Sequence, residues 1–149
     1  IPIGFYDDSI IPGSGGIQII PNATLYHFGV LTSRVHMSWM RAVCGRLKSD
    51  YRYSKNIVYN CFAWPSPTQT QRSKIESAAQ KILDARALYP DSSFADLYDD
   101  DFMPLELRNA HRLNDSAVCE SYGWDENITE DDITANLFTL YQEKINSAK

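Results

Sequence analysis

The residues best suited to chemistry in this sequence are basic side chains between Tyr26 and Pro65. Over residues 46–56 they alternate with aromatic rings, hydroxyls and an amide. Lys, Arg and Ser suit contact with phosphate, Arg or Asn can read base edges, and Tyr can stack on a base or sugar. The stretch therefore predicts a surface that faces a polyanion, and nucleic acid is the polyanion we favour. The basic residues of this segment are Arg34, Arg41, Arg46, Lys48, Arg52 and Lys55.

The charges of the chain divide into two blocks. Residues 1–65 hold six Lys or Arg and three acids, a net charge of +3, whereas residues 66–149 hold eight and sixteen, a net charge of −8. The whole chain is therefore acidic, at −5. The distribution lets the first block face phosphate and excludes the second. An alternative interpretation of residues 46–56 is a solvated loop that Tyr51 and Tyr53 hold against the domain.

Catalytic or metal-binding chemistry has little basis in the sequence. The histidines and cysteines are dispersed, without zinc-ligand spacing or a Cys-x-x-Cys motif. Consecutive carboxylates at 99–101 point in different directions, so we interpret them as a solvated turn. The glycines of residues 12–16 precede an apolar run and not a helix, so they close a loop and do not cradle phosphate. We expect no catalytic centre, metal or cofactor in this segment.

A few short strands and one helix are expected to position the basic residues of the first block. Short apolar runs predict strands over 1–6, 17–20 and 57–62. Apolar residues three and four apart predict a largely buried helix over 33–44. Gly29 and the capping residue Ser33 predict a kink or break before it, and Gly45 is expected to end it in a left-handed conformation.

The second block reads as helices. Thr68 and Gln71 form a capping box that starts a helix ending near Tyr89, and a short turn follows over 94–98. Pro104 begins the next helix, which Gly123 ends. Thr129 precedes the last helix, whose first turn is acidic. The predicted class is α+β: a small N-terminal sheet segment with one long, possibly kinked helix, then a mainly α-helical bundle.

Length and composition fit a globular protein of one or two small domains. The chain has 149 residues, 44% hydrophobic and 22% charged, and we divide it into residues 1–65 and 66–149. It opens at Ile1 inside an expected strand, so we expect it to be part of something longer. Apolar runs are too short to cross a bilayer. Three scattered cysteines suit a reducing compartment, and we expect a cytoplasmic location.

Several motifs carry a resemblance to a known family. The run from Leu25 to Arg86 resembles the C-terminal region of large, single-chain, MmeI-like bacterial DNA methyltransferases, where the end of the target-recognition domain passes into a C-terminal helical domain. The resemblance fades after Trp124, and Ala63 stands where the family's Phe-Pro-Trp-Pro motif has proline. The similar elements are the helix with Leu31-Thr32-Ser33, Trp39 and Arg41, then Tyr51–Lys55, Tyr59-Asn60, Phe62, Trp64-Pro65, Leu83–Arg86, Tyr89-Pro90, Met103-Pro104, Leu107 and Ala110-His111.

This resemblance implies adenine-N6 methylation with S-adenosylmethionine, often within a restriction or phage-defence system. The segment has no Asn-Pro-Pro-Tyr or Asn-Pro-Pro-Phe motif to hold a flipped adenine. We therefore expect it to bind double-stranded DNA and to brace the methyltransferase core of the same chain, with no catalytic step of its own. Base reading is expected of Arg52 or Asn56. The predicted DNA-binding residues are Arg34, Arg41, Arg46, Lys48, Arg52, Tyr53, Lys55 and Asn56.

A different function class remains open from the sequence. The helical bundle can be a protein-protein interaction module without direct DNA contact. Its acidic last two helices would then bind the partner, and the basic stretch would pair with acids elsewhere. Binding to the rest of the parent protein, set against an electrophoretic shift with duplex DNA, discriminates between these two classes. For DNA contact we expect the basic side chains to gather on one exposed side, and side chains on opposite faces or paired with neighbouring acids would count against it.

Overall fold

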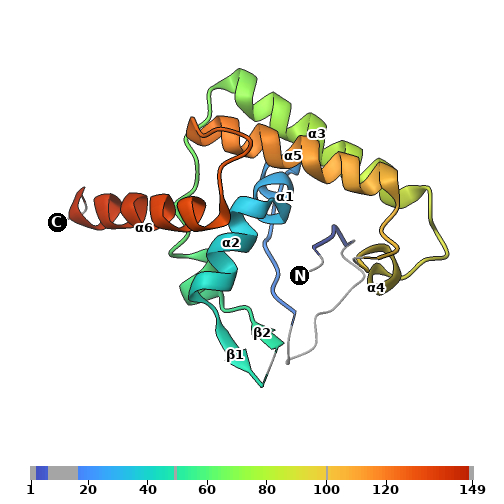
Figure 1. Ribbon diagram of the computed structural model, residues 1–149, viewed down its shortest axis with the longest axis horizontal. Helices are drawn as coiled ribbons and strands as arrows, with labels where there is room; N and C mark the ends of the chain where they lie inside the picture. The colour runs from blue at the N-terminus through green and yellow to red at the C-terminus, as the bar shows by residue number, and fades with distance from the viewer. Residues whose placement is uncertain (1–2, 7–16, 49, 100, 148–149) are drawn as a thin grey trace.

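The computed structural model describes residues 3–6, 17–48, 50–99 and 101–147 (Figure 1). Helices predominate, and a two-stranded antiparallel sheet accompanies them, so the predicted α+β class is confirmed. The turn expected at 7–9 and the glycine-rich stretch 12–16 lie outside the described residues. In chain order the elements are α1 (Leu25–Thr32), α2 (Arg34–Val43), β1 (Gly45–Leu47), β2 (Asp50–Arg52), the π-helix η1 (Lys55–Tyr59), α3 (Gln69–Ala87), α4 (Phe94–Leu97), α5 (Leu105–Tyr122) and α6 (Glu130–Ser147).

Two long helices form one side of the molecule. α3 and α5 lie side by side and run in opposite directions, with α4 in the connection between them (Figure 1). α1 packs on α3, and α2 leads from it toward the strands β1 and β2, which lie at the opposite end from α3 (Figure 1). α6 packs on α2 near its start, and its C-terminal end projects away from the other helices (Figure 1). None of the described helices is long and apolar enough to cross a membrane.

Ser33 separates α1 from α2, as predicted. Its backbone is extended, with φ −68° and ψ 156°. The hydroxyl donates to the Val30 carbonyl at 2.7 Å and accepts from the His36 amide at 3.4 Å, which satisfies one group left unpaired at the end of α1 and one at the start of α2. The other predicted caps are confirmed too: Thr68 accepts from the Gln71 amide, and Gly123 ends α5 with φ 74°.

The core joins both blocks of the chain. One cluster of buried side chains combines residues before position 66 with residues of α3, α5 and α6. The helix predicted over 33–44 therefore packs on the bundle, and not on a sheet formed by the strands predicted in the first block. The deepest members of this cluster are Val30, Val35, Trp39, Val58, Phe62, Ile75, Val118, Ile133 and Leu137.

The predicted strands are wrong within the described residues. Residues 3–6 and 17–20 have no regular structure, and Ile17 and Ile19 are exposed. Residues 57–62 begin in the π-helix because Val58 and Phe62, four apart, are both fully buried, while Ile57 is half exposed. A strand would also place Val58 and Phe62 on one face, but together with Asn60 between them, and Asn60 is exposed. Gly45 also departs from the prediction, since it lies in β1 and not in a left-handed helix end.

Gly29 allows α1 to approach its neighbours closely. A Cβ atom there would lie 2.7 Å from Ile75 Cγ2 and 2.9 Å from Asn114 Oδ1. The Asn114 side-chain amide also donates to the Gly29 carbonyl at 2.8 Å. The glycine is thus required by the contact of α1 with α3 and α5, and not by its backbone angles.

We predict that Gly29→Ala destabilises the protein despite the better helix propensity of alanine. Overpacking a core costs about 1–3 kcal/mol, whereas alanine recovers at most about 1 kcal/mol over glycine. Chemical denaturation measures the difference. Gly45→Ala is the matched control, because its added Cβ would have no atom within 4 Å. A Gly29→Ala variant at least as stable as the wild type would contradict the packing described.

Candidate nucleic-acid interface

The basic stretch forms a β-hairpin and not the open loop that the sequence suggested. β1 and β2 pair antiparallel, with Gly45 opposite Arg52, Arg46 opposite Tyr51 and Leu47 opposite Asp50. We call residues 45–52 the basic hairpin. Every described residue of it is exposed. Lys48 occupies the turn with a φ of 57°, a left-handed conformation of the kind that tight hairpin turns require.

The basic hairpin presents cations on both of its faces, and not on the single exposed side that the sequence predicted. Because side chains alternate along a strand, Arg46 lies with Tyr51 on one face and Arg52 lies with Leu47 on the other. The Arg46 guanidinium stacks over the Tyr51 ring at 4.4 Å and donates to its hydroxyl at 3.3 Å. This contact holds the Arg46 guanidinium over its cross-strand neighbour without neutralising its charge.

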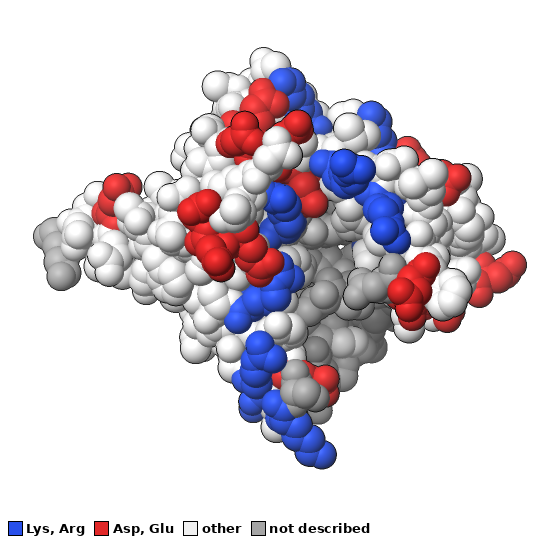
Figure 2. Space-filling model, viewed as in Figure 1, with Lys and Arg blue, Asp and Glu red and all other residues white. Residues whose placement is uncertain are grey.

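No described residue forms an ion pair with a cation of the basic hairpin. The described ion pairs lie elsewhere, at Arg41–Glu130, Arg72–Glu76 and Lys74–Glu120. Figure 2 shows Lys and Arg side chains gathered at the hairpin and continuing over α2, beside acidic side chains where α6 begins. Positive charge that is exposed and unpaired can attract an anionic partner.

Two hydrogen bonds anchor the hairpin to α2. Tyr53, which follows β2, places its hydroxyl 2.9 Å from His36 Nε2. The Trp39 indole N–H donates to the Val58 carbonyl in η1 at 3.0 Å. Since both anchor residues belong to α2 and are buried, the chain that leaves the hairpin has a fixed position on the core.

Burial shifts the pKa values of both groups in the first anchor, His36 and Tyr53. It lowers the pKa of His36 to about 3, so the imidazole is neutral near pH 7. Burial also raises the pKa of Tyr53 well above its usual value. The ring of His36 meets Phe62 edge to face, with the centroids 4.6 Å apart. Tyr53 thus serves to hold the hairpin, and its hydroxyl is not free to contact DNA.

The structure separates Arg34 and Arg41 from the basic hairpin. The Arg34 guanidinium donates to the Ile128 carbonyl, and its backbone amide donates to Asp115 Oδ1 at 2.7 Å. Arg34 therefore joins α2 to α5 and to the loop before α6. Arg41 is half exposed and pairs with Glu130 at 2.6 Å, at the border of the positive surface.

Lys55 and Asn56 lie just beyond the hairpin. Both begin η1 and are exposed, and no described residue pairs with the Lys55 ammonium group. The Asn56 backbone carbonyl accepts from the Cys61 thiol at 3.3 Å. The Asn56 side-chain amide has no hydrogen-bond partner among the described residues. Of the eight predicted residues, five are exposed on the hairpin or at the start of η1: Arg46, Lys48, Arg52, Lys55 and Asn56.

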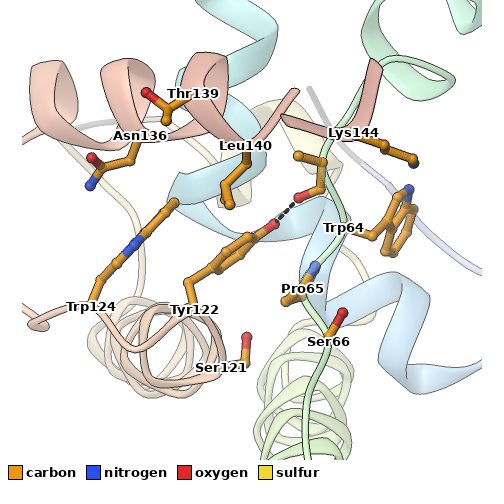
Figure 3. Close-up of a pocket in the computed structure, with 11 residues that line it drawn as sticks. Trp64, Pro65, Ser66, Ser121, Tyr122, Trp124, Asn136, Thr139, Leu140 and Lys144 are labelled. Carbon is orange, nitrogen blue, oxygen red and sulfur yellow. Dashed lines mark hydrogen bonds between the residues drawn. The ribbon is translucent and has the colours of Figure 1, made fainter. Parts of the chain in front are cut away.

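A separate cleft lies between the chain at Trp64 and the helices α5 and α6. It has a volume of about 630 Å³ and is lined by aromatic and small polar side chains, with the ring of Tyr122 stacked on Trp124 at 4.3 Å (Figure 3). The Tyr122 hydroxyl donates to the Ala63 carbonyl at 2.7 Å (Figure 3). No carboxylate lines this cleft. Among the described residues, no group of three or more His, Cys, Asp or Glu is placed to hold a metal ion.

Two known protein-domain families match this chain, one over each of its two parts. The family description "MmeI, target recognition domain" matches residues 1–66, and "MmeI, C-terminal domain" matches residues 67–148. This chain belongs to the MmeI family. The resemblance predicted from its motifs is confirmed, and the basic hairpin lies in the part that matches target recognition.

Two relatives have known names. DNA methyltransferase A of Bacillus subtilis (strain 168) is 39% identical over 144 residues, which are 96% of this chain and 16% of that protein. The solved structure of the type IIL restriction-modification enzyme MmeI in complex with DNA is 47% identical, with a TM-score of 0.82, and the match covers 85% of this chain and 17% of that one. The chain thus spans about a sixth of the length of these MmeI-family relatives.

We predict that Tyr53→Phe destabilises this MmeI-family domain, although the ring is retained. The change leaves His36 Nε2 without its partner in a buried site, and an unmade buried hydrogen bond costs about 1–3 kcal/mol. Chemical denaturation reads the loss. Tyr51→Phe removes an exposed hydroxyl from the hairpin and is the control. Equal losses in the two variants would contradict the anchor.

We also predict that stability falls on acidification partly through His36. In the unfolded chain the His36 imidazole binds a proton below about pH 6.5, whereas in the folded protein its pKa is about 3. Because the unfolded state binds more protons between these values, the free energy of unfolding falls as pH drops through this window. Burial lowers the pKa of His111 to about 4, which acts in the same direction. Burial raises the pKa of Asp115 to about 6, which acts in the opposite direction.

A His36→Gln variant isolates the contribution of this one group. Between pH 6 and pH 4 its unfolding free energy should depend less steeply on pH, by up to about 1.4 kcal/mol per pH unit, the value for one proton. Denaturant titrations of both proteins at several pH values give the two slopes. Parallel slopes would show that His36 is charged in the folded protein.

Proposed function

We propose that this chain provides DNA target recognition to an S-adenosylmethionine-dependent DNA adenine-N6 methyltransferase. The observation that carries the proposal is the basic hairpin: its cations are exposed and have no ion-pair partner among the described residues. Its place within the target-recognition match, and the DNA-bound structure of a relative at 47% identity, support it.

The shape of the hairpin favours insertion into a groove. A two-stranded ribbon fits the major groove of B-DNA, which is about 12 Å wide. A ribbon lying flat on DNA would use one face, but a ribbon inside the groove has a phosphate backbone on either side. Arg46 on one face and Arg52 on the other then both reach phosphates, with Lys48 at the tip. Arg52, or Asn56 just after the hairpin in the chain, then reads the base edges.

S-adenosylmethionine belongs to another part of the intact protein in this proposal. When bound, it supplies the methyl group. The described residues do not fit it: the cleft at Trp64 has no carboxylate for the ribose hydroxyls, and no glycine-rich turn lines it. The residues of this chain would act by holding DNA in place, and no chemical step is assigned to them.

The helical bundle has a supporting role in the same proposal. The names of the relatives imply a methyltransferase portion in the intact protein. We propose that the bundle packs against this portion of the same chain and supports it, in a cytoplasmic protein. α6 suits such a contact, because its projecting half leaves Phe138 and Ile145 exposed by 42% and 40%. The alternative of an interaction module without DNA contact loses support, since the cations of the hairpin are not paired with described acids.

A salt titration tests the proposal. In the intact protein, Arg46, Lys48 and Arg52 are changed together to Ala, and binding to a labelled duplex is measured over a range of salt concentrations. Each phosphate contact contributes about 0.9 to the slope of log affinity against log salt, so the slope should fall by about 2.7.

The control removes the same charge elsewhere. Lys74, Lys81 and Lys144 are exposed residues of α3 and α6, and changing them to Ala gives a variant of identical net charge. Its slope should match that of the wild type. A hairpin variant whose slope is unchanged, or no smaller than that of the control variant, would overturn the assignment of the hairpin to DNA.

A further inference from the structure

The end of the bundle around α4 concentrates the negative charge of the chain. Residues 87–107 run from the last residue of α3 to the first turn of α5, and we call them the acidic end. They contain six acids and no Lys, Arg or His, a net charge of −6, whereas the whole of residues 66–149 carries −8. Figure 2 shows Asp and Glu side chains at this end, apart from the Lys and Arg of the basic hairpin.

Three large apolar side chains of the acidic end are open to solvent. Phe102 is 80% exposed, more than any other large apolar side chain of the described residues, and Leu105 and Leu88 are 67% and 64% exposed. Leu88 and Leu105 belong to neighbouring segments, because the residues that follow them are joined by a hydrogen bond: the Tyr89 hydroxyl donates to Glu106 Oε2 at 3.2 Å. Exposed apolar side chains with a charged rim are typical of a surface that contacts another protein surface.

Arg86 holds the segment 3–6 against this end. The buried Arg86 guanidinium donates to the Ile3 carbonyl at 2.7 Å and lies 4.8 Å over the ring of Phe94, the first residue of α4. A Cβ atom added at Gly4 would lie 3.7 Å from the same ring. Breaking the bond to Ile3 would leave a buried charge less well compensated, which is costly. This part of the target-recognition match is therefore fixed beside the acidic end.

We propose that the acidic end is a docking surface for the part of the intact protein that precedes residue 1, and that it meets there a basic surface with an apolar centre. The inference rests on the proposed function, in which the methyltransferase portion belongs to the same chain. The match spans about a sixth of each relative, and residues 67–148 match a domain described as C-terminal. The rest of the intact protein then connects through the segment that Arg86 holds beside α4.

The charge of the acidic end determines which partner it can take. Its carboxylates repel the phosphates of DNA, so this end faces away from the duplex. Basic side chains opposite the carboxylates are attracted to them and fix the orientation of the two surfaces. Removal of Phe102, Leu88 and Leu105 from water stabilises the contact. Figure 1 shows α4 and the projecting end of α6 on opposite sides of the molecule, so the bundle is held at two separate places.

Site-specific crosslinking in the intact protein tests the docking surface. A photoreactive phenylalanine analogue replaces Phe102, the protein is irradiated without DNA, and mass spectrometry identifies the peptides that are joined. We expect a crosslink, within one molecule, to a peptide that precedes residue 1. The control has the same analogue at Leu113, which is 51% exposed on α5 but lies outside the acidic end, and it should give no such crosslink.

A pair of charge variants tests the complementarity. Asp91→Lys with Asp101→Lys reverses two exposed acids of the acidic end, and the crosslink yield from position 102 should fall by about tenfold or more, because like charges then face each other. Glu126→Lys with Asp131→Lys makes the same change of net charge at exposed positions before α6 and in its first turn. The yield in this control variant should equal that of the protein without charge changes.

Several results would overturn the docking surface. They are no crosslink from position 102, a crosslink confined to residues 1–149, a crosslink between two molecules, an equal crosslink from position 113, or a yield that the reversed charges at 91 and 101 leave unchanged. Circular dichroism checks folding, and if the protein changed at Phe102 unfolds, the analogue at Leu105 takes its place with the same expectations. The salt slope of the hairpin variant separates the two proposals: a reduced slope keeps the proposed function even if the crosslink fails, and an unchanged slope overturns that function even if the crosslink forms.

Discussion

The attachment of one polar hairpin to one buried helix is the constraint on which the functional surface depends. An isolated two-stranded hairpin is marginally stable in water, and every described residue of this one is exposed. Its position comes from the chain that follows it. Tyr53 bonds to His36, and the carbonyl of Val58 accepts from Trp39. Both partners lie on α2, whose own position is fixed by the shared core.

The distribution of paired and unpaired cations gives this surface its character. Arg86, for example, is buried, donates to Tyr98 and to the Ile3 carbonyl, and lies over aromatic rings. Arg34 and Arg41 are similarly engaged within the chain. The cations of the hairpin form no ion pair with a described residue, and the contact of Arg46 with Tyr51 leaves its charge unpaired. Exposed charges are strongly hydrated and cost little to maintain, so their absence from ion pairs is compatible with stability and leaves them available to a polyanion.

Local sequence signals predicted the helices well. Ser33, Thr68, Gly123 and the spacing of apolar residues depend on interactions within a few positions, and the structure has the corresponding breaks and caps. Tertiary contacts decided the rest. The apolar run at 57–62 matches a strand, but the packing of Val58 and Phe62 against α2 selects a π-helix. Nothing in the neighbourhood of Tyr53 indicates that a histidine seventeen residues earlier binds its hydroxyl.

The candidate site could be predicted only in part, because local sequence signals show where basic residues cluster but not which of them have distant partners. A cluster of Lys and Arg between residues 46 and 56 can be recognised directly, and five of the eight residues chosen from it and from the preceding helix are exposed on the hairpin or just after it. Arg34 and Tyr53 could not be excluded, because their partners lie far away in sequence.

Photo-crosslinking from the tip of the hairpin tests the central claim most directly. A photoreactive phenylalanine analogue replaces Lys48 in one sample of the intact protein and Lys144 in another, and each is irradiated with a labelled duplex. We predict a crosslink to DNA from position 48 and none from position 144. No crosslink from position 48, in a protein that still binds the duplex, would contradict the placement of the hairpin against DNA.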